Sequence, residues 1–268
     1  MTSSFRLASV HLRVRDLARS LEFYSAKLGF AVLNSSGGRA SPEQSRRADL
    51  APAPDAPALL TLLEDRTAPP APRDAAGLFH AALLLPSRAA LGAWLRVAAE
   101  RGVEFHGFSD HGVSEAVYFA DPDGNGLEFY ADRPQAEWPF AANGELAMVT
   151  RPLDLPSLLA DSPAATPTPL AGARWGHLNL RVTDLDRSEK FYRDSLGVTL
   201  TQGSYPGARF LAADGYHHHL GLNTWGHPRA PLPAGALGLA EATFVRTGVT
   251  APQSLRDPDG IVLRLIGP

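Results

Sequence analysis

The stretch DLARSLEFYSAKLG at residues 16–29 returns later in the chain as DLDRSEKFYRDSLG at residues 184–197. Eight of the fourteen positions carry the same residue in both copies: Asp, Leu, Arg, Ser, Phe, Tyr, Leu and Gly. Similarity of this kind between two parts of one chain indicates an internal duplication. We therefore expect repeated structural units. Positions where the copies differ in polar residues should show which copy retains a chemical site.

Each copy is predicted to be a strand followed by a helix. Residues 9–15 and 177–183 alternate between apolar and polar side chains, which is typical of a half-buried strand. Asp16 and Asp184 stand where a helix N-cap belongs, and Gly29 and Gly197 stand where each helix should stop. The repeated stretch is thus predicted to be helical in both halves.

Two further units follow the same plan. Residues 78–85 are predicted to be a strand, residues 88–101 a helix, and residues 117–131 a hairpin that turns at the sequence DPDG, 121–124. The same DPDG returns at 257–260, before a final predicted strand at 261–266. Gly77 lies 44 positions before the first DPDG, but Gly238 lies only 19 positions before the second. The fourth unit is therefore expected to be shortened and to lack its helix.

These units suggest three regions of the chain. Residues 1–134 are predicted to form one pair of modules, and residues 173–268 a second, degenerate pair. Between them, residues 135–172 are rich in Pro and Ala, include SPAATPTPL, and are predicted to be a connector.

Composition excludes several kinds of partner and site. The net charge is −3 with no run of like charges, so neither nucleic acid nor a membrane surface is expected as a partner. There is no apolar stretch long enough to span a bilayer and no signal-like start, so a cytoplasmic protein is predicted. The chain contains no cysteine, which leaves His, Asp and Glu as metal ligands. We expect small-molecule partners.

Three polar side chains are predicted to share one face of a sheet. In the strand pattern His11 alternates with apolar residues, and His80 and Glu128 do the same in their own strands. Two neutral imidazoles and one carboxylate are the facial set that holds a divalent metal and leaves three positions open; non-haem Fe(II) is its usual occupant. Each residue alone is weak evidence, since a lone strand histidine is more often structural. Their matched places in repeated modules favour a metal site.

The modules resemble the vicinal oxygen chelate superfamily, which includes glyoxalases, bleomycin-resistance proteins and type I extradiol dioxygenases. The strings SDHGVSEAVYFADPDGNGLEFY at 109–130 and YHHHLGLNTW at 216–225 are most similar to bacterial catechol 2,3-dioxygenase-like proteins. The resemblance implies an α+β fold in which tandem βαβββ modules form two cupped mixed sheets. It also implies a metal inside one cup.

The resemblance further implies a reaction and two catalytic residues. Extradiol enzymes use non-haem Fe(II) to open an aromatic diol beside its hydroxyls with molecular oxygen; Mn, Zn or Ni are alternative metals. A tyrosine ten residues before the ligand glutamate touches the substrate, and Tyr118 stands at that spacing before Glu128. His111 is a candidate for the histidine that handles protons. The assembly state is left open, and a homo-oligomer would cover an edge of the shortened module.

The second half departs from the metal-binding pattern. Aligning the repeats places Asn179 opposite His11, Glu241 opposite His80 and Arg264 opposite Glu128. We therefore expect no metal there and an ion pair between Glu241 and Arg264. The run His217, His218 and His219 is expected to be packing or a wall facing the substrate, and His177 a neighbour of the site.

Three alternative functions use the same fold. A glyoxalase would need a further glutamate from the strand at 59–64, where Glu64 lies only at the end. A fosfomycin-type thiol transferase uses two histidines and a glutamate, but an apolar cleft suits an aromatic ring better than a phosphonate. A bleomycin-resistance-like binding protein needs the cup without metal ligands, so the retained triad argues against it.

Overall fold

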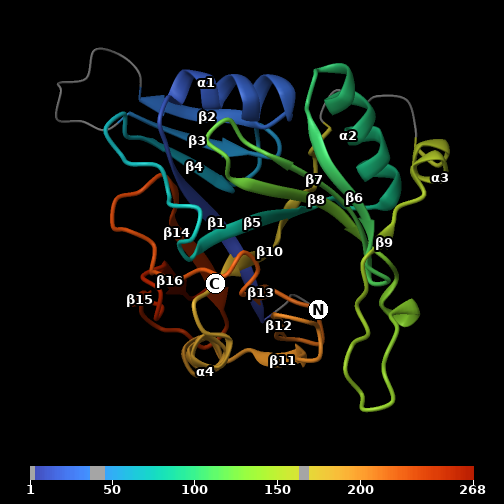
Figure 1. Cartoon of the computed structure of the whole chain (residues 1–268). Coiled ribbons are helices and arrows are strands. Elements are labelled where there is room, and N and C mark those ends of the chain that lie inside the picture. Colours follow the sequence, from blue (N-terminus) through green and yellow to red (C-terminus); the bar gives the residue numbers. More distant parts are fainter. Residues whose placement is uncertain (1–3, 37–45, 163–168) are drawn as a thin grey trace.

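The computed structural model describes residues 4–36, 46–162 and 169–268. It is an α+β protein with two strongly curved mixed sheets and few helices (Figure 1). The fold class predicted from the sequence is confirmed. In the described part of the chain no helix is long and apolar enough to cross a membrane.

The first sheet has seven strands in the order β15-β16-β14-β1-β4-β3-β2. Its strands are β1 (Phe5–Val14), β2 (Ala31–Ser36), β3 (Arg47–Ala51), β4 (Leu60–Glu64), β14 (Gly238–Arg246), β15 (Gln253–Arg256) and β16 (Val262–Ile266). It therefore combines the first module with the last. No helix separates β14 from β15, so the fourth module is shortened as predicted, and β15 is left at an edge of the sheet.

The second sheet has nine strands in the order β11-β12-β13-β10-β5-β8-β7-β6-β9. Its strands are β5 (Gly77–Leu84), β6 (Phe105–Asp110), β7 (Ser114–Ala120), β8 (Gly126–Asp132), β9 (Arg151–Pro152), β10 (Arg174–Arg181), β11 (Thr199–Gln202), β12 (Ala208–Ala212) and β13 (Leu220–Asn223). It combines the second module with the third.

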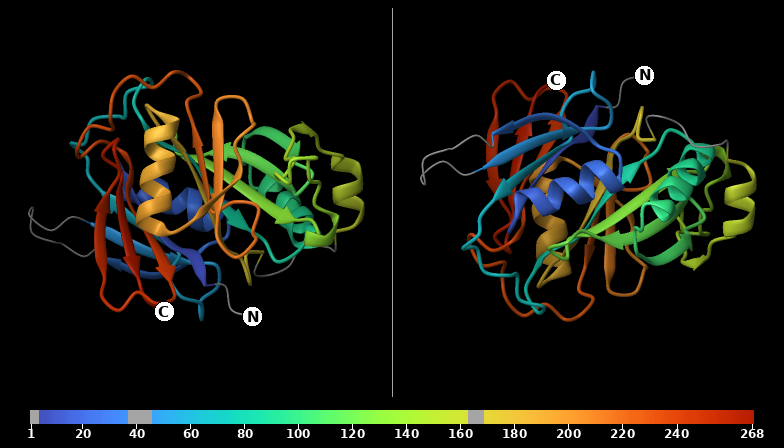
Figure 2. Two further views of the ribbon diagram at one scale, coloured as in Figure 1. Left: turned by 90° about the horizontal axis from the view of Figure 1, so that it is seen from below. Right: turned by 90° about the horizontal axis from the view of Figure 1, so that it is seen from above.

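This pairing differs from the one expected from the order of modules along the chain. From the sequence, the first two modules were expected to join in residues 1–134 and the last two in residues 173–268. In the structure β1 pairs antiparallel with β14, and β5 pairs antiparallel with β10, so each sheet contains strands from both halves. Figure 2 shows the blue and red strands side by side and the green and orange strands side by side. The reason is that modules join by pairing of their edge strands. The periodicity within a strand does not specify which other strand it pairs with.

The helices match the repeated stretches. The first copy forms α1 (Leu17–Leu21), which continues as a π-helical segment η1 (Glu22–Lys27), and the second forms α4 (Leu185–Leu196). The predicted N-caps are present, because the Asp16 side chain accepts from Arg19 N–H and the Asp184 side chain from Arg187 N–H. The remaining helices are α2 (Arg88–Glu100), η2 (Gln135–Glu137) and α3 (Leu155–Ala160).

A tyrosine from each copy of the repeat joins two modules. The buried Tyr24 hydroxyl donates to Asp121 at 3.0 Å, and the buried Tyr192 hydroxyl donates to Asp257 at 2.9 Å. Both acceptors are the first Asp of a DPDG turn. Each pair therefore links a helix to the turn of the following module, which belongs to the other sheet. The repeated Tyr is thus the donor, and the first Asp of the repeated DPDG the acceptor, of the same hydrogen bond in both copies.

The region predicted to be a connector is more ordered than expected where it is described. It contains η2, α3 and β9, and β9 extends the nine-stranded sheet by pairing with β6. Residues 163–168, within the Pro/Ala-rich stretch, lie outside the described residues.

Candidate metal centre

Three side chains of the nine-stranded sheet converge on one point. His80 on β5, Glu128 on β8 and His177 on β10 offer ligand atoms that all lie within 4.8 Å of one another. His80 Nε2 lies 2.9 Å from Glu128 Oε2, and His177 Nε2 lies 3.2 Å from the same oxygen. The three side chains are 7%, 3% and 2% exposed. They form a buried set of two imidazoles and one carboxylate.

Strand order explains why these residues meet. β5 lies between β10 and β8, in antiparallel contact with β10 and in parallel contact with β8. Gly126 permits the close approach of β8, because a Cβ there would lie 2.0 Å from the carbonyl oxygen of Phe79. Glu128 is thereby held beside the strand that carries His80.

The geometry fits a divalent metal. His80 Nε2 is buried and has no hydrogen-bond partner in the described structure, although it points at Glu128. A facial octahedral set with metal–ligand bonds of about 2.1 Å separates neighbouring donors by roughly 3 Å. The two nitrogen–oxygen distances agree with that value. The donor set also suits a first-row metal such as iron, manganese, nickel or zinc.

Burial keeps the His177 ring neutral. Burial lowers the pKa of His177 to about 4, although the nearby Glu128 carboxylate opposes the shift, so the ring retains a free lone pair near pH 7. Burial alone would raise the pKa of Glu128, but the His177 and His80 rings outweigh this and lower it well below its usual value. The carboxylate is therefore charged and available as a ligand.

His11, predicted as the third ligand, lies elsewhere. It is on β1 of the seven-stranded sheet, with its Nδ1 3.9 Å from Glu241 Oε1. The module pairing is the reason: β10, not β1, is the antiparallel neighbour of β5. His177, interpreted from the sequence as a neighbour of the site, takes the place that His11 was expected to fill. No pattern within its own strand could have selected it, because the pairing of β10 with β5 that brings it beside His80 joins residues far apart in sequence.

The seven-stranded sheet has a cavity at the corresponding place. It is lined by Ser9, His11, Glu241 and Arg264, among others. In the described structure Glu241 pairs with His11 and not with Arg264, in contrast to the expected ion pair. Glu64 ends β4, where its carboxylate accepts from Leu17 N–H and pairs with arginines.

The buried triad opens into a cavity of about 280 Å³ with mainly apolar walls. The cavity is lined by Phe79, His80, Ser109, His111, Ser114, Tyr118, Glu128, Met148, Val149, Thr150, His177, Asn179, Tyr205, Phe210, His218 and Trp225. An engineered cavity of about 150 Å³ is enough to hold benzene. A single substituted aromatic ring therefore fits.

His111 and Tyr118 lie together in this cavity. His111 Nδ1 is 2.6 Å from the carbonyl of Val149, and its Nε2 is 2.7 Å from the Tyr118 hydroxyl. Since a carbonyl only accepts, Nδ1 carries the proton and Nε2 of the neutral ring accepts from Tyr118. Burial, reinforced by the charge of Glu128, raises the pKa of Tyr118 well above its usual value. Tyr118 is thus a phenol that can be a proton donor.

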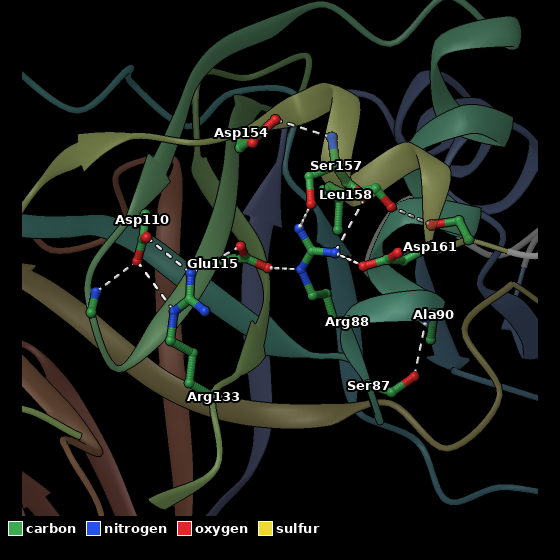
Figure 3. Close-up of polar contacts among 12 residues, drawn as sticks. Ser87, Arg88, Ala90, Asp110, Glu115, Arg133, Asp154, Ser157, Leu158 and Asp161 are labelled. Atoms are coloured by element: carbon green, nitrogen blue, oxygen red, sulfur yellow. Dashed lines mark hydrogen bonds and ion pairs between the residues drawn. The ribbon is translucent and has the colours of Figure 1, made fainter. Parts of the chain in front are cut away.

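An ion-pair network fixes the turn that carries His111 (Figure 3). Asp110 accepts from Gly112 N–H at 2.8 Å and from Arg133 at 2.9 Å, and Arg133 also bonds the buried Glu115 at 3.0 Å. Arg88 bonds the other Glu115 oxygen at 2.6 Å and reaches Asp161 beyond α3. Burial opposes the charge of Asp110, but these donors lower its pKa below the usual value. The connector is therefore tied to the hairpin beside the cavity.

The histidine run contributes one side chain to the cavity. His218 lines it, with its ring centroid 4.0 Å from that of His177, and burial lowers its pKa well below the usual value. His219 packs edge-on against Phe5, and burial lowers its pKa to about 3. Met148, Val149 and Thr150 of the connector also line the cavity, which the composition of that region gave no reason to expect.

Comparison with known proteins identifies the family. The model of the Glyoxalase/Bleomycin resistance protein/Dioxygenase superfamily matches residues 6–129 and 174–248. The chain belongs to this superfamily. The predicted resemblance is therefore confirmed.

One curated member of the superfamily is similar over most of its length. The Catechol-2,3-dioxygenase of Bacillus subtilis (strain 168) is 41% identical over 239 residues, which cover 87% of this chain and 80% of that protein. This similarity supports a dioxygenase-like function.

Solved structures of the superfamily share the fold. A putative dioxygenase from Bacillus subtilis has a TM-score of 0.67 at 12% identity and covers all of this chain and 86% of its own. Glyoxalase I from Zea mays has a TM-score of 0.59 at 20% identity, over 99% of this chain and 93% of its own. At such identities the likeness concerns the fold and not the reaction.

Proposed function

We propose that the protein is an extradiol dioxygenase that opens the ring of a catechol-type aromatic with molecular oxygen, with Fe(II) held by His80, Glu128 and His177. One observation carries the proposal: two imidazole nitrogens and one carboxylate oxygen converge at a cavity with aromatic walls that also contains a bonded His–Tyr pair. The identity to a protein named Catechol-2,3-dioxygenase supports it. His177 replaces His11 in the ligand set.

The metal would supply the redox chemistry. His80, Glu128 and His177 would hold it, and its remaining coordination positions would be open to the cavity. The ligands carry one negative charge in total, so a divalent ion leaves the site one positive charge. This charge favours an anionic diol over a neutral aromatic.

The cavity residues orient the ring. Phe79, Phe210 and Trp225 offer apolar surface, and the ligand atoms of the triad lie within 4.8 Å of one another. Burial of the triad also excludes water from the charged ligands, which strengthens their interaction with a bound substrate.

His111 and Tyr118 are proposed as the catalytic pair. A catechol must lose protons as it binds, and the Tyr118 oxygen can take a hydroxyl proton while the tyrosine's own proton passes to His111 Nε2. The Val149 carbonyl keeps the other His111 proton on Nδ1, so Nε2 is the nitrogen that accepts. The reverse transfer, from His111 through Tyr118, returns a proton to the product. A histidine ring nitrogen can accept a proton and give it back, which suits both directions.

The test is direct. Protein loaded with Fe(II) without oxygen is mixed with catechol or ring-substituted catechols and then exposed to air, and the absorbance of the yellow ring-opened semialdehyde is followed. We expect colour with at least one catechol, and no colour with Glu128→Gln. Arg264→Ala, at the matching position of the other sheet, should retain the activity. Absence of colour with every catechol, in protein shown to contain iron, would contradict the proposal.

A further inference from the structure

Asp132, His217 and His218 form a chain of hydrogen bonds that ends at the cavity wall. His217 is fully buried; its Nε2 lies 2.9 Å from Asp132 Oδ1, and its Nδ1 lies 2.7 Å from Nδ1 of His218. His218 in turn lines the cavity. The chain therefore runs from Asp132 at the end of β8, through one buried ring, to a ring that faces the space where a ligand would bind.

The direction of the hydrogen bonds follows from Asp132. An ionised carboxylate only accepts, so His217 must carry its proton on Nε2. A neutral His217 then has a lone pair on Nδ1 and can only accept there. The short contact between the two Nδ1 atoms consequently requires the proton to be on His218 Nδ1. The remaining nitrogen of a neutral His218, Nε2, has a free lone pair.

The surroundings hold Asp132 as an acceptor. The Tyr216 hydroxyl donates to both of its oxygens, at 3.2 and 3.0 Å, and the Tyr130 hydroxyl lies 2.7 Å from that of Tyr216. Gly176 leaves the space for Tyr130, since a Cβ there would lie 1.7 Å from the Tyr130 hydroxyl. The Tyr216 hydroxyl thereby holds the Asp132 carboxylate in an orientation toward His217.

Packing fixes the ring of His217. Its centroid lies 4.0 Å from that of Tyr216 and 5.1 Å from that of Trp138. Both of its nitrogens are bonded, so a flip of the ring would break two hydrogen bonds in a buried place.

We propose that Asp132 and His217 are positioning residues that set the tautomer of His218, so that its Nε2 faces the cavity as a hydrogen-bond acceptor. Such a nitrogen selects a ligand that presents an O–H or N–H group. That this group is a hydroxyl of an aromatic diol rests on the proposed function, whereas the tautomer itself does not.

The tautomer is measured without activity. Protein labelled with ¹⁵N-histidine and loaded with diamagnetic Zn(II) is studied by long-range ¹H–¹⁵N correlation, which distinguishes protonated from bare ring nitrogens. We expect His218 to be protonated at Nδ1 and His217 at Nε2. In His217→Phe the proton of His218 should move at least partly to Nε2. A wild-type His218 protonated at Nε2, or an unchanged pattern in His217→Phe, would overturn the proposal.

A neighbouring variant provides the control. His219 is adjacent in sequence, but its Nδ1 accepts from Ala213 N–H, so His219→Gln should leave the His218 pattern unchanged. If His217→Phe does not fold, the wild-type spectrum and Asp132→Asn still decide the question.

Kinetics add a second readout. In Fe(II)-loaded protein with an active catechol, His217→Phe and Asp132→Asn should lower kcat/KM by at least about tenfold, mainly through a raised KM, with unchanged metal content. If no catechol reacts but the tautomer is as expected, the proposed function fails and the assignment of positioning residues stands. Unchanged kcat/KM in both variants would contradict a role for this hydrogen-bond chain in the reaction.

Discussion

The two cups of this protein are built alike but differ in what they can hold. In the nine-stranded sheet the cup carries His177, His80 and Glu128; the matching places in the seven-stranded sheet carry Ser9, Glu241 and Arg264. The ligands of the first are at most 7% exposed, whereas His11 and Glu241 are 25% and 27% exposed.

Under the proposed function, the difference indicates how one copy of a duplicated site loses its metal. Ser9 removes an imidazole, and Arg264 places a cation where Glu128 places a carboxylate. A fixed positive charge repels a divalent ion, so the change at this one position is enough to disfavour a metal. His11 remains, but its partner is Glu241 on the adjacent strand. The strands of the seven-stranded sheet nevertheless keep their apolar residues, so this cup still packs as part of the core.

The largest expected effect concerns the catalytic pair. Tyr118 lies three residues before its DPDG turn, and Ser254 stands at that place in the other sheet. Tyr118→Phe removes the proton that bonds His111, and we expect kcat/KM for an active catechol to fall by about 10²–10⁴-fold. Ser254→Ala should change it less than twofold. Steady-state kinetics at matched iron content measure kcat/KM of both variants. Equal losses in Tyr118→Phe and Ser254→Ala would show that the two cups do not differ in catalysis.

The nine-stranded side should also lose stability in acid. His177 and His219 belong to the nine-stranded side, and burial lowers their pKa values to about 4 and about 3. Their unfolded pKa is near 6.5, so the unfolded chain takes up protons first as pH falls. The stability they confer is complete above pH 6.5 and is lost as pH falls toward 4.

Urea unfolding of metal-free protein at pH 7.5 and pH 5 measures this loss. For His177 alone the loss reaches roughly 3 kcal/mol once the pH is below its folded pKa, and part of it is reached by pH 5. His219→Gln should make the pH dependence shallower. Stability that does not change between the two pH values would mean that these rings are not buried as neutral groups.

The smallest expected effect tests what the two sides share. Tyr24→Phe and Tyr192→Phe each remove a buried hydrogen bond to an aspartate of a DPDG turn, and each should lower the free energy of unfolding by about 1.5–3 kcal/mol. The two losses should be similar, because the contacts are copies. Neither variant should change the metal content. A loss confined to one variant would show that the repeat has diverged in its packing as well as its chemistry.

Much of the fold could be predicted from local patterns. The two copies of the helix, their Asp caps, the DPDG turns and the missing helix of the fourth module all depend on residues close together in sequence, and the structure contains them. His80 and Glu128 could likewise be placed on one face, because both lie in the same module.

The third ligand could not be predicted in this way. Which modules join is decided by strand edges about a hundred residues apart, such as those of β5 and β10, and alternation within a strand says nothing about them. Modules joined in chain order would place His11 beside His80, whereas the observed pairing places His177 there. The connector was missed for a related reason: it gains order by packing against α2 and pairing with β6, not from its own periodicity.

The most direct test of the account is the metal content of two histidine variants. Wild-type protein, His177→Gln and His11→Gln are each incubated with excess Fe(II) without oxygen, freed of unbound metal and analysed for iron per chain. We predict one iron in the wild type and in His11→Gln, and almost none in His177→Gln. Loss of iron in His11→Gln with retention in His177→Gln would contradict the assignment of the metal to the nine-stranded sheet.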